Sequence, residues 1–383
     1  MTQGYRLINA TKDLVAFCDQ AAEFGWLALD TEFVRTKTFY AELGLVQLWS
    51  AEQWVLVDPL NGVDLSPLWA LLARNDVLTV MHAAGEDLEI IGHYRQFAAQ
   101  APARMFDTQI AWAFLHEGNQ IGYAGLVEKL CGVTLDKSQS RTDWLARPLS
   151  QAQLDYAAAD ALYLAKMFPQ IKQDIEQSPL YAFFQQECAF QIEKRSRVIN
   201  PDYAWREVGG FAHMKGVQRA IMAELAKWRM TTAQRENIAL PFLLKEPVMT
   251  DIALRQPSSV HELSKIEGIH PRVLRQRGKD IVAAIERGKA WPEAEWPLAI
   301  PRLDDHPAYK KWFKDAKALI AERAKSHNLA PTLLGSRKQI NEVFIWSQYT
   351  ANAVKQEVSQ PELLSSWRHE VAGRELEALA NSL

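Results

Sequence analysis

The sequence has 383 residues with 43 lysines and arginines against 46 aspartates and glutamates, a net charge of −3 and a pI near 6.3. This balance argues against a strongly basic nucleic-acid-binding protein and against an acidic disordered tail. Hydrophobic residues make up 48% of the chain, which is ordinary for a globular protein, and at roughly 150 residues per domain the length predicts two or three domains.

The cysteines and the N-terminus indicate the compartment. Cys18, Cys131 and Cys188 lie far apart and lack the CxxC spacing of a structural zinc site, which favours a reducing environment. The N-terminal segment has no basic stretch followed by an apolar core, and no run approaches the roughly 18 apolar residues that span a bilayer. We therefore expect a cytoplasmic protein with no membrane partner.

The charge is divided unevenly along the chain. Residues 1–195 contain 15 basic and 24 acidic residues, a net charge of −9, whereas residues 196–383 contain 28 and 22, a net charge of +6. One interpretation places metal-binding carboxylates in the first half and phosphate contacts in the second. The alternative is the ordinary variation of a solvated surface.

The first half alternates between strand and helix patterns. Apolar runs predict three strands, at 25–30, 44–49 and 54–59. The connections between them are too short for crossover helices, which predicts antiparallel pairing. Further strands and helices are expected at 66–75, 77–81, 85–94, 105–115, 125–130 and 150–177. This order is typical of a mixed-sheet α/β domain, which we assign to residues 1–195.

The second half shows only helical periodicity, and it contains an internal repeat. Helices are expected at 214–236, 248–256, 259–265, 271–287, 307–327, 331–345 and 360–380. Two amphipathic helices each end in Asn-(Ile/Leu)-Ala followed by proline, at Asn237 and at Asn328. We therefore expect two all-α modules, at 211–290 and 300–383, joined by a stiff proline-containing linker at 291–297.

Four carboxylates and one tyrosine form the candidate catalytic set. Asp30 and Glu32 end the first predicted strand, where alternation sends both to one face. Two such carboxylates repel each other unless a cation neutralises them, and hard divalent ions prefer oxygen ligands. Asp87 lies in the first turn of a predicted helix, where helix-dipole stabilisation is the alternative role. Tyr156 and Asp160 share one face of a long helix with apolar surroundings, where a buried carboxylate needs a partner.

These residues resemble three motifs of a known family. Asp30-x-Glu32, then His82-Ala-Ala-Gly-Glu-Asp87, then Tyr156-x-x-x-Asp160 match, in order and spacing, the DEDD 3′–5′ exonucleases of the tyrosine subtype. Asp143-Trp-Leu-Ala-Arg-Pro-Leu-Ser150 before the third motif strengthens the match, and within the family the chain resembles the ribonuclease D group. The two helical modules look like helicase-and-ribonuclease-D C-terminal (HRDC) domains, the second more divergent than the first. No motif residue departs from the family pattern.

The resemblance implies a ribonuclease-H-like catalytic fold and a mechanism with two divalent metal ions, Mg²⁺ or Mn²⁺. By analogy Asp30 would bridge both ions. Glu32 and Asp160 would hold the ion that activates the attacking water, and Asp87 would reach the second ion through water. A phenol with a pKa near 10 is a poor base at neutral pH, so we expect Tyr156 to orient the water instead.

Three further residues each have more than one possible role or a structural one. Phe33 and His82 are candidate substrate-binding residues, since Phe33 could stack on a base and His82 could contact the terminal nucleotide. A core role is the alternative for Phe33, and a structural role is the alternative for His82. Asp107 is expected to cap the helix that follows it.

The function that the resemblance implies is 3′–5′ exoribonuclease activity on structured RNA, with the 3′ extensions of tRNA precursors as substrate and nucleoside 5′-monophosphates as products. Two basic surfaces of the helical half would bind phosphates, with a solvated helix face or a protein interface as alternatives; they comprise Lys265, Arg272, Arg275, Arg277 and Lys279, and Lys310, Lys311, Lys314 and Lys317. A DNA exonuclease and a non-catalytic RNA-binding scaffold are the competing interpretations. We expect a monomer.

Overall fold

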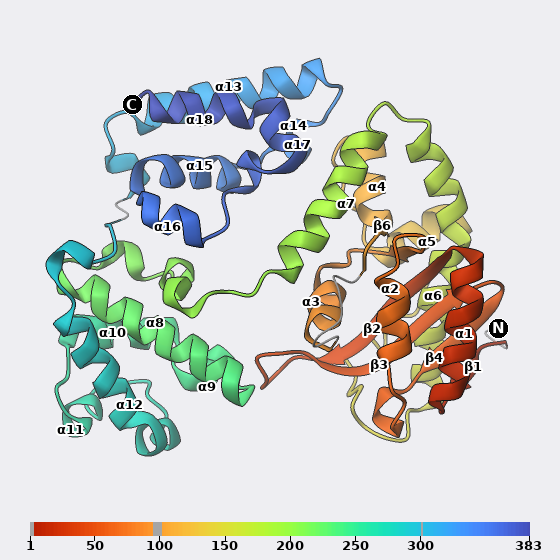
Figure 1. The fold of residues 1–383 in the computed structure, drawn as a ribbon, viewed down its shortest axis with the longest axis horizontal. Helices are drawn as coiled ribbons and strands as arrows, with labels where there is room; N and C mark the ends of the chain where they lie inside the picture. The colour runs from red at the N-terminus through yellow and green to blue at the C-terminus, as the bar shows by residue number, and fades with distance from the viewer. Residues whose placement is uncertain (1–3, 95–101, 300–301) are drawn as a thin grey trace. The chain divides into compact units, whose positions relative to one another are not determined.

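The computed structural model describes residues 4–94, 102–299 and 302–383. The chain forms two compact units (Figure 1), and the first contains the whole of the β-sheet. The first unit comprises Met1–Arg35, Ala41–Arg197 and Glu322–Leu334, and the second comprises Thr36–Tyr40, Val198–Ala321 and Gly335–Leu383. Within the described ranges, no helix is both long enough and apolar enough to cross a membrane.

The first unit is built on a six-stranded mixed sheet with the order β1-β4-β3-β2-β5-β6. β2, β3 and β4 pair antiparallel, as their short connections predict, whereas β1, β5 and β6 pair parallel to their neighbours. The predicted mixed-sheet α/β class is therefore confirmed. The strands are β1 Arg6–Ile8, β2 Trp26–Val34, β3 Glu42–Ser50, β4 Gln53–Val57, β5 Leu78–Met81 and β6 Met105–Asp107.

Helices cover both faces of this sheet (Figure 1). α6 packs across β2, β3 and β4, and Ala157, Ala158 and Ala161, fully buried, allow its backbone to approach the strands closely. α1 contacts the opposite face. The helices predicted within residues 66–177 are confirmed, but the sequence patterns did not predict β1, α1 or α7. The helices are α1 Thr11–Phe24, α2 Ser66–Leu72, α3 Gly85–Tyr94, α4 Thr108–Leu115, α5 Tyr123–Cys131, α6 Gln151–Glu176 and α7 Tyr181–Ser196.

The described residues from 198 onward form helices and turns but no strand, as predicted. The single helix expected at 331–345 is two helices, because Ser336 caps a new helix at Arg337 through a capping box with Gln339. The helix expected at 360–380 is also divided, into a 3₁₀ turn at Glu362–Leu364, α17, a π-helical turn at His369–Gly373 and α18. The helices are α8 Val217–Glu236, α9 Leu240–Leu243, α10 Glu246–Arg255, α11 Val260–Leu263, α12 Pro271–Ala290, α13 Tyr309–Ser326, α14 Pro331–Leu334, α15 Arg337–Tyr349, α16 Asn352–Glu357, α17 Ser366–Arg368 and α18 Arg374–Asn381.

The internal repeat corresponds to a repeated helix ending. α8 is followed by Asn237 (φ 50°) and α13 by Asn328 (φ 55°), both in the left-handed conformation that asparagine tolerates. In each case the next amide donates back to the preceding helix, from Ile238 to the Ala233 carbonyl and from Leu329 to the Ala324 carbonyl. The repeated Asn-(Ile/Leu)-Ala therefore marks the same helix ending in both modules.

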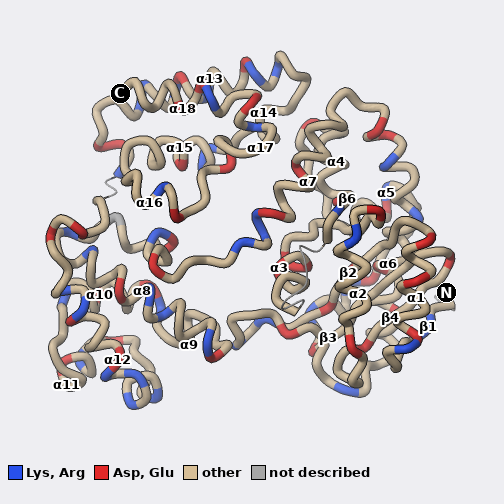
Figure 2. Tube along the Cα trace, viewed as in Figure 1, with Lys and Arg blue, Asp and Glu red and all other residues tan. Residues whose placement is uncertain are grey.

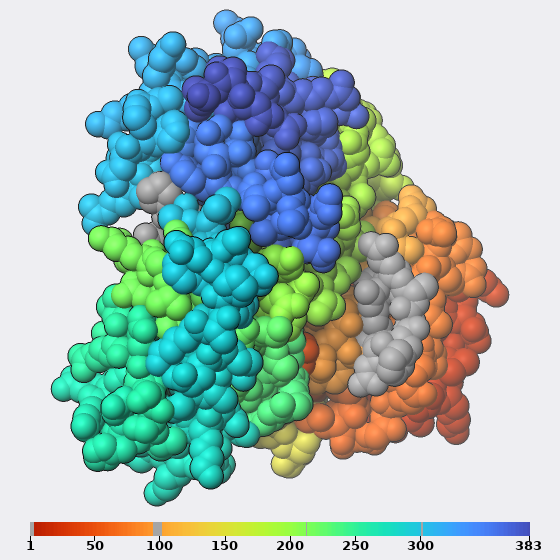
Figure 3. Space-filling view, turned by 60° about the vertical axis from the view of Figure 1, so that its left-hand side comes forward, coloured from red at the N-terminus to blue at the C-terminus, as the bar shows by residue number. Residues whose placement is uncertain are grey.

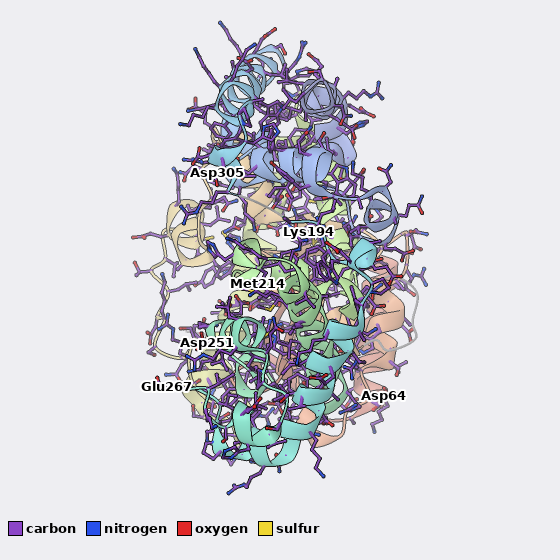
Figure 4. The ribbon with its side chains drawn as sticks, turned by 90° about the vertical axis from the view of Figure 1, so that its left-hand side faces the viewer. Asp64, Lys194, Met214, Asp251, Glu267 and Asp305 are labelled. Atoms are coloured by element: carbon purple, nitrogen blue, oxygen red, sulfur yellow. The ribbon has the colours of Figure 1, made fainter. Side chains whose placement is uncertain are left out.

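The first helical module has its own hydrophobic core. α8, α10 and α12 supply most of the core side chains, and residues 246–290 form a closely packed body in the space-filling view (Figure 3). Met214 is buried in this core and Glu267 is exposed on the surface of the module (Figure 4). The start expected for the second module, at residue 300, lies outside the described residues.

Candidate active site

Two of the candidate carboxylates lie on the central strand β2. Asp30 and Glu32 alternate with Thr31, so both face the side of the sheet that α6 covers. The same side carries Trp26, whose ring lies 4.6 Å from the ring of Phe168 on α6, measured between centroids. The strand therefore presents both carboxylates toward α6.

Asp160 on α6 completes a group of three carboxylates. Asp30, Glu32 and Asp160 each offer an oxygen, and these oxygens lie within 4.8 Å of one another. Among the described residues, no other group of three or more aspartate, glutamate, histidine or cysteine side chains could hold a metal ion in this way. Oxygen ligands at this spacing suit a hard divalent cation.

The pKa values of the three carboxyl groups are raised. Burial, followed by repulsion from Asp87, Asp160 and Glu32, raises the pKa of Asp30 well above its ordinary value. Burial and the charges of Asp160 and Asp87 raise the pKa of Glu32 to about 9, and burial raises that of Asp160 to about 7. Ionising all three groups is therefore unfavourable unless a cation neutralises them.

Asp87 lies in the first turn of α3 and is not a member of the group of three. Its Oδ1 accepts a hydrogen bond from the Thr31 hydroxyl at 2.5 Å, and burial raises its pKa to about 6. Its charge nevertheless contributes to the raised pKa values of Asp30 and Glu32. The structure thus brings all four predicted carboxylates to one region, with Asp87 held by Thr31, a residue that sequence reasoning missed.

Tyr156 lies one turn before Asp160 on α6. Its ring packs beside Trp144, with 6.1 Å between centroids. Burial, followed by the charges of Asp160, Glu32 and Asp30, raises the pKa of the phenol above its ordinary value. The phenol is therefore protonated at neutral pH and can donate a hydrogen bond, but it cannot act as a base there.

A second tyrosine, which sequence reasoning also missed, lies against Asp160. The Tyr123 hydroxyl donates to the Asp160 carbonyl, and its pKa is raised well above the ordinary value by burial and then by the charges of Asp160 and Asp30. The contact ties α5 to α6 at the position of the carboxylate. Nothing in the local sequence around Tyr123 indicates this pairing, because the two residues are far apart along the chain.

Asp107 caps α4, as predicted, and also binds the segment that precedes α3. Its carboxylate accepts hydrogen bonds from the backbone amides of Gln109 and Ile110 in α4. It also accepts from the amides of Ala83 (3.1 Å) and Ala84 (2.9 Å), at a turn where Ala83 has φ 54°. Asp107 therefore holds the start of α3, the helix that carries Asp87.

The two candidate substrate-binding residues lie outside the group of three carboxylates. Phe33 follows a register shift between β2 and β3 and is half-buried. His82 Nδ1 lies 2.9 Å from the Thr108 hydroxyl, its ring packs edge-on against Tyr123, and burial lowers its pKa. These contacts are compatible with a structural role for His82, and its role toward substrate stays a prediction.

The segment before α6 is held to the sheet by Arg147. Its guanidinium makes two 2.7 Å hydrogen bonds to the buried Asp58 carboxylate and donates to the carbonyls of Trp144 (2.9 Å) and Gly44 (2.6 Å). Gly44 allows the Trp144 backbone to lie close to β3, since a Cβ at position 44 would lie 2.5 Å from the Trp144 carbonyl oxygen. Arg147 thereby fixes Trp144, the residue against which Tyr156 packs.

Replacing Arg147 with alanine is expected to lower the free energy of unfolding by about 3 kcal/mol, because Asp58 would stay buried without its cation. Urea denaturation measures the loss. Arg74→Ala is the matched control, since the Arg74–Asp76 pair is exposed and contributes less than about 1 kcal/mol. Equal effects of the two substitutions would contradict this role of Arg147.

Three sequence families match successive parts of the chain. Residues 5–176 match the family described as 3′–5′ exonuclease, residues 218–285 match the HRDC domain, and residues 307–376 match the C-terminal HRDC domain of ribonuclease D. These matches follow the order of one α/β unit and two helical modules. They cover both the sheet that carries the carboxylates and the repeated helical half.

Proteins with known names and solved structures are similar to this chain over nearly its full length. The chain is 37% identical to ribonuclease D of Escherichia coli over 379 residues, covering 99% of this chain and 98% of that protein. It is 30% identical to ribonuclease D of Haemophilus influenzae, covering 98% and 92% of the two chains. The crystal structure of Escherichia coli RNase D, described as an exoribonuclease involved in structured RNA processing, superposes with a TM-score of 0.90, 36% identity and 99% coverage of both chains. The chain therefore belongs to the ribonuclease D family of 3′–5′ exoribonucleases.

Proposed function

We propose that the protein removes the 3′ extensions of tRNA precursors and other structured RNAs and releases nucleoside 5′-monophosphates. The observation that carries the proposal is the group of Asp30, Glu32 and Asp160, whose oxygens lie within 4.8 Å of one another beside Tyr156. The substrate class is supported by the full-length similarity to a ribonuclease D described as acting in structured RNA processing.

The donor set suits hard divalent cations, and we propose that it holds two, Mg²⁺ or Mn²⁺. Every candidate ligand is a carboxylate oxygen, and the raised pKa values show that the ionised group lacks compensating positive charge from the protein. Asp30, Glu32 and Asp160 would hold one ion, and Asp30 with Asp87 would hold the other. When bound, such ions neutralise the carboxylates, acidify water and stabilise the charge that develops on the leaving oxygen.

The side chains have separate tasks in hydrolysis. Water attacks the last phosphorus, and the bond to the 3′ oxygen of the preceding nucleotide breaks, so the released nucleotide keeps its 5′ phosphate. The protonated phenol of Tyr156 donates a hydrogen bond that orients the attacking water. Thr31 holds the Asp87 carboxylate in place, and Phe33 and His82 are proposed to contact the terminal nucleotide.

Replacing Tyr156 with phenylalanine is expected to lower kcat about 100-fold, because the orienting hydroxyl is lost. Mn²⁺ and RNA affinities should not change, since the phenol is not a ligand. Degradation of a labelled RNA measures the rate, fluorescence anisotropy measures RNA affinity, and calorimetry measures Mn²⁺ affinity. Tyr163→Phe, on the same helix, is the control and should degrade RNA at the wild-type rate. Near wild-type activity of Tyr156→Phe would refute the role.

The helical half is proposed to hold the RNA backbone. Lys and Arg residues recur along α12 and α13 (Figure 2), and most of those predicted to bind phosphate are exposed. Arg277 is an exception, because it is half-buried and pairs with Glu236. The exposed residues are Lys265, Arg272, Arg275 and Lys279, and Lys310, Lys311, Lys314 and Lys317. Binding through them would be salt-dependent and largely independent of sequence.

Three further proposals concern organisation. The division into an exonuclease domain at 1–195 and HRDC domains at 211–290 and 300–383 is supported by the three family matches. A reducing, cytoplasmic location is supported by the three free cysteines. The third proposal is that the protein is a monomer, and light scattering measures its oligomeric state.

The deciding experiment is incubation of the purified protein with a 3′-extended tRNA precursor, with and without Mg²⁺. Stepwise shortening from the 3′ end, abolished by chelation, is the expected result, and internal cleavage would contradict it. Labelled RNA and DNA of one sequence, compared in parallel, separate the proposal from a DNA exonuclease.

A further inference from the structure

Gln47 occupies the position opposite Asp30 in the sheet. It lies on the central strand β3, where its Cα pairs with Asp30 of β2 on one side and with Leu56 of β4 on the other. Directly opposed residues of an antiparallel pair project to the same face, with Cβ atoms about 5 Å apart. The Gln47 side chain therefore projects to the face that carries Asp30 and Glu32.

That face is closed over Gln47 by α6. Leu45 and Leu56, which project beside Gln47, are packed with Ala157 and Ala158 of α6 and with Trp144. Gln47 itself has no exposed surface. Its amide therefore lies in the layer between the sheet and α6, the layer that also contains the carboxylate of Asp160.

The Gln47 amide has no hydrogen-bond partner among the described residues, at either its oxygen or its nitrogen. A buried amide without partners costs about 1–3 kcal/mol, and such a group in a folded protein requires an explanation, for example a bound water or ion. An apolar residue of the same length would fill the position without this cost. Gln47 therefore places a buried polar amide at this position, and its hydrogen-bond partner is not among the described protein groups.

We infer that Gln47 is a positioning residue for Asp30: its Nε2 donates a hydrogen bond, directly or through one ordered water, to the Asp30 carboxylate. The inference deepens the proposed function and rests on it. The hydrogen bond would fix the orientation of the carboxylate toward a divalent cation, as partners of metal ligands do. Gln47 touches neither the RNA nor the reacting atoms.

The test is Mn²⁺ binding to the full-length, RNA-free protein, measured by calorimetry on the wild type, Gln47→Met and Gln47→Leu. Both variants are expected to bind Mn²⁺ about tenfold more weakly, because partners of metal ligands typically contribute this much to affinity. Their metal-free melting temperatures should equal or exceed that of the wild type, since the unpaired amide is gone. A merely structural role would not weaken metal binding while preserving stability.

Thr79→Val is the matched control. Thr79 is also fully buried, and its hydroxyl lacks a partner among the described residues, but it pairs with Leu27 on the face of the sheet away from Asp30. Its Mn²⁺ affinity should equal that of the wild type. A decrease of less than fivefold in either folded Gln47 variant, or an equal decrease in Thr79→Val, would overturn the inference.

RNA degradation by the same proteins separates this inference from the proposed function. In the Gln47 variants kcat should fall at low Mn²⁺ and recover at high Mn²⁺, with KM for RNA unchanged. A wild-type protein that neither binds Mn²⁺ nor shortens RNA would refute the proposed function instead. A wild-type protein that does both, together with variants that match it, would refute only the role of Gln47.

Discussion

Replacing Asp30 with asparagine is expected to reduce the rate of RNA hydrolysis at least ~1000-fold and to raise the melting temperature of the metal-free protein. The rate falls because Asp30 is proposed to contact both cations, and losing about 4 kcal/mol of transition-state stabilisation corresponds to about three powers of ten. Stability rises because burial and the neighbouring carboxylates raise the pKa of the Asp30 carboxyl group well above its ordinary value, so its ionised form is unfavourable in the folded, metal-free protein. Asparagine removes this unfavourable charge.

Opposite changes in activity and stability distinguish a functional carboxylate from a structural one. Degradation of a labelled RNA and calorimetric unfolding in EDTA measure the two effects on the same preparation. Asp174→Asn, at an exposed site on α6, is the control and should leave both quantities near wild type. Wild-type degradation by Asp30→Asn would mean that the activity belongs to a contaminating nuclease and would favour the non-catalytic scaffold.

Without divalent cations, the melting temperature of the sheet-containing unit is expected to fall as the pH rises from about 5 to about 9. The folded-state pKa values of Glu32, about 9, and Asp160, about 7, exceed the ordinary values of 4.5 and 3.8. Across this range the folded protein binds protons that the unfolded chain has released. The stability that they contribute is therefore complete below the ordinary pKa values and is lost as the pH rises through the folded ones.

Millimolar Mg²⁺ is expected to oppose this loss, and its stabilising effect should grow with pH because the cations compete with protons for the same carboxylates. Calorimetric scans in EDTA and in Mg²⁺ across the pH range measure both effects, and we expect a difference of roughly 5–10 °C at the alkaline end. Glu32→Gln should flatten the profile in EDTA. A wild-type profile that is level or rising in EDTA would be inconsistent with these raised pKa values.

Local sequence patterns predicted most of the architecture. Strands β2, β3 and β4 were predictable because apolar runs with short connections leave antiparallel pairing as the only arrangement. The close packing of α6 was predictable from three alanines between Tyr156 and Asp160. α1, α7 and β1 were missed; β1 has only three residues and is defined by its pairing with β4, which lies far along the chain.

The residues that support the candidate site could not be predicted in the same way. The supporting hydrogen bonds join residues that are far apart in the sequence. The separation is 56 positions for Thr31, 37 for Tyr123 and 89 for Arg147, and no local spacing encodes such a contact. Gln47 is opposite Asp30 only because of the register between β2 and β3. Which residues lie opposite each other or form these hydrogen bonds depends on how the whole sheet packs against α6.

The net charge of −3 includes four carboxylates that the tertiary structure brings to one region. By itself, the sequence determined the fold class, the repeated helical half and the identity of the four carboxylates and the tyrosine, because alternation, helical periodicity and motif spacing are local properties. Only the tertiary structure decided that Asp30, Glu32 and Asp160 meet within 4.8 Å and that Asp87 accepts a hydrogen bond from Thr31. The distances between these side chains depend on how strand, sheet and helix pack together, and that packing buries the carboxylates deeply enough to raise their pKa values and favour a bound cation.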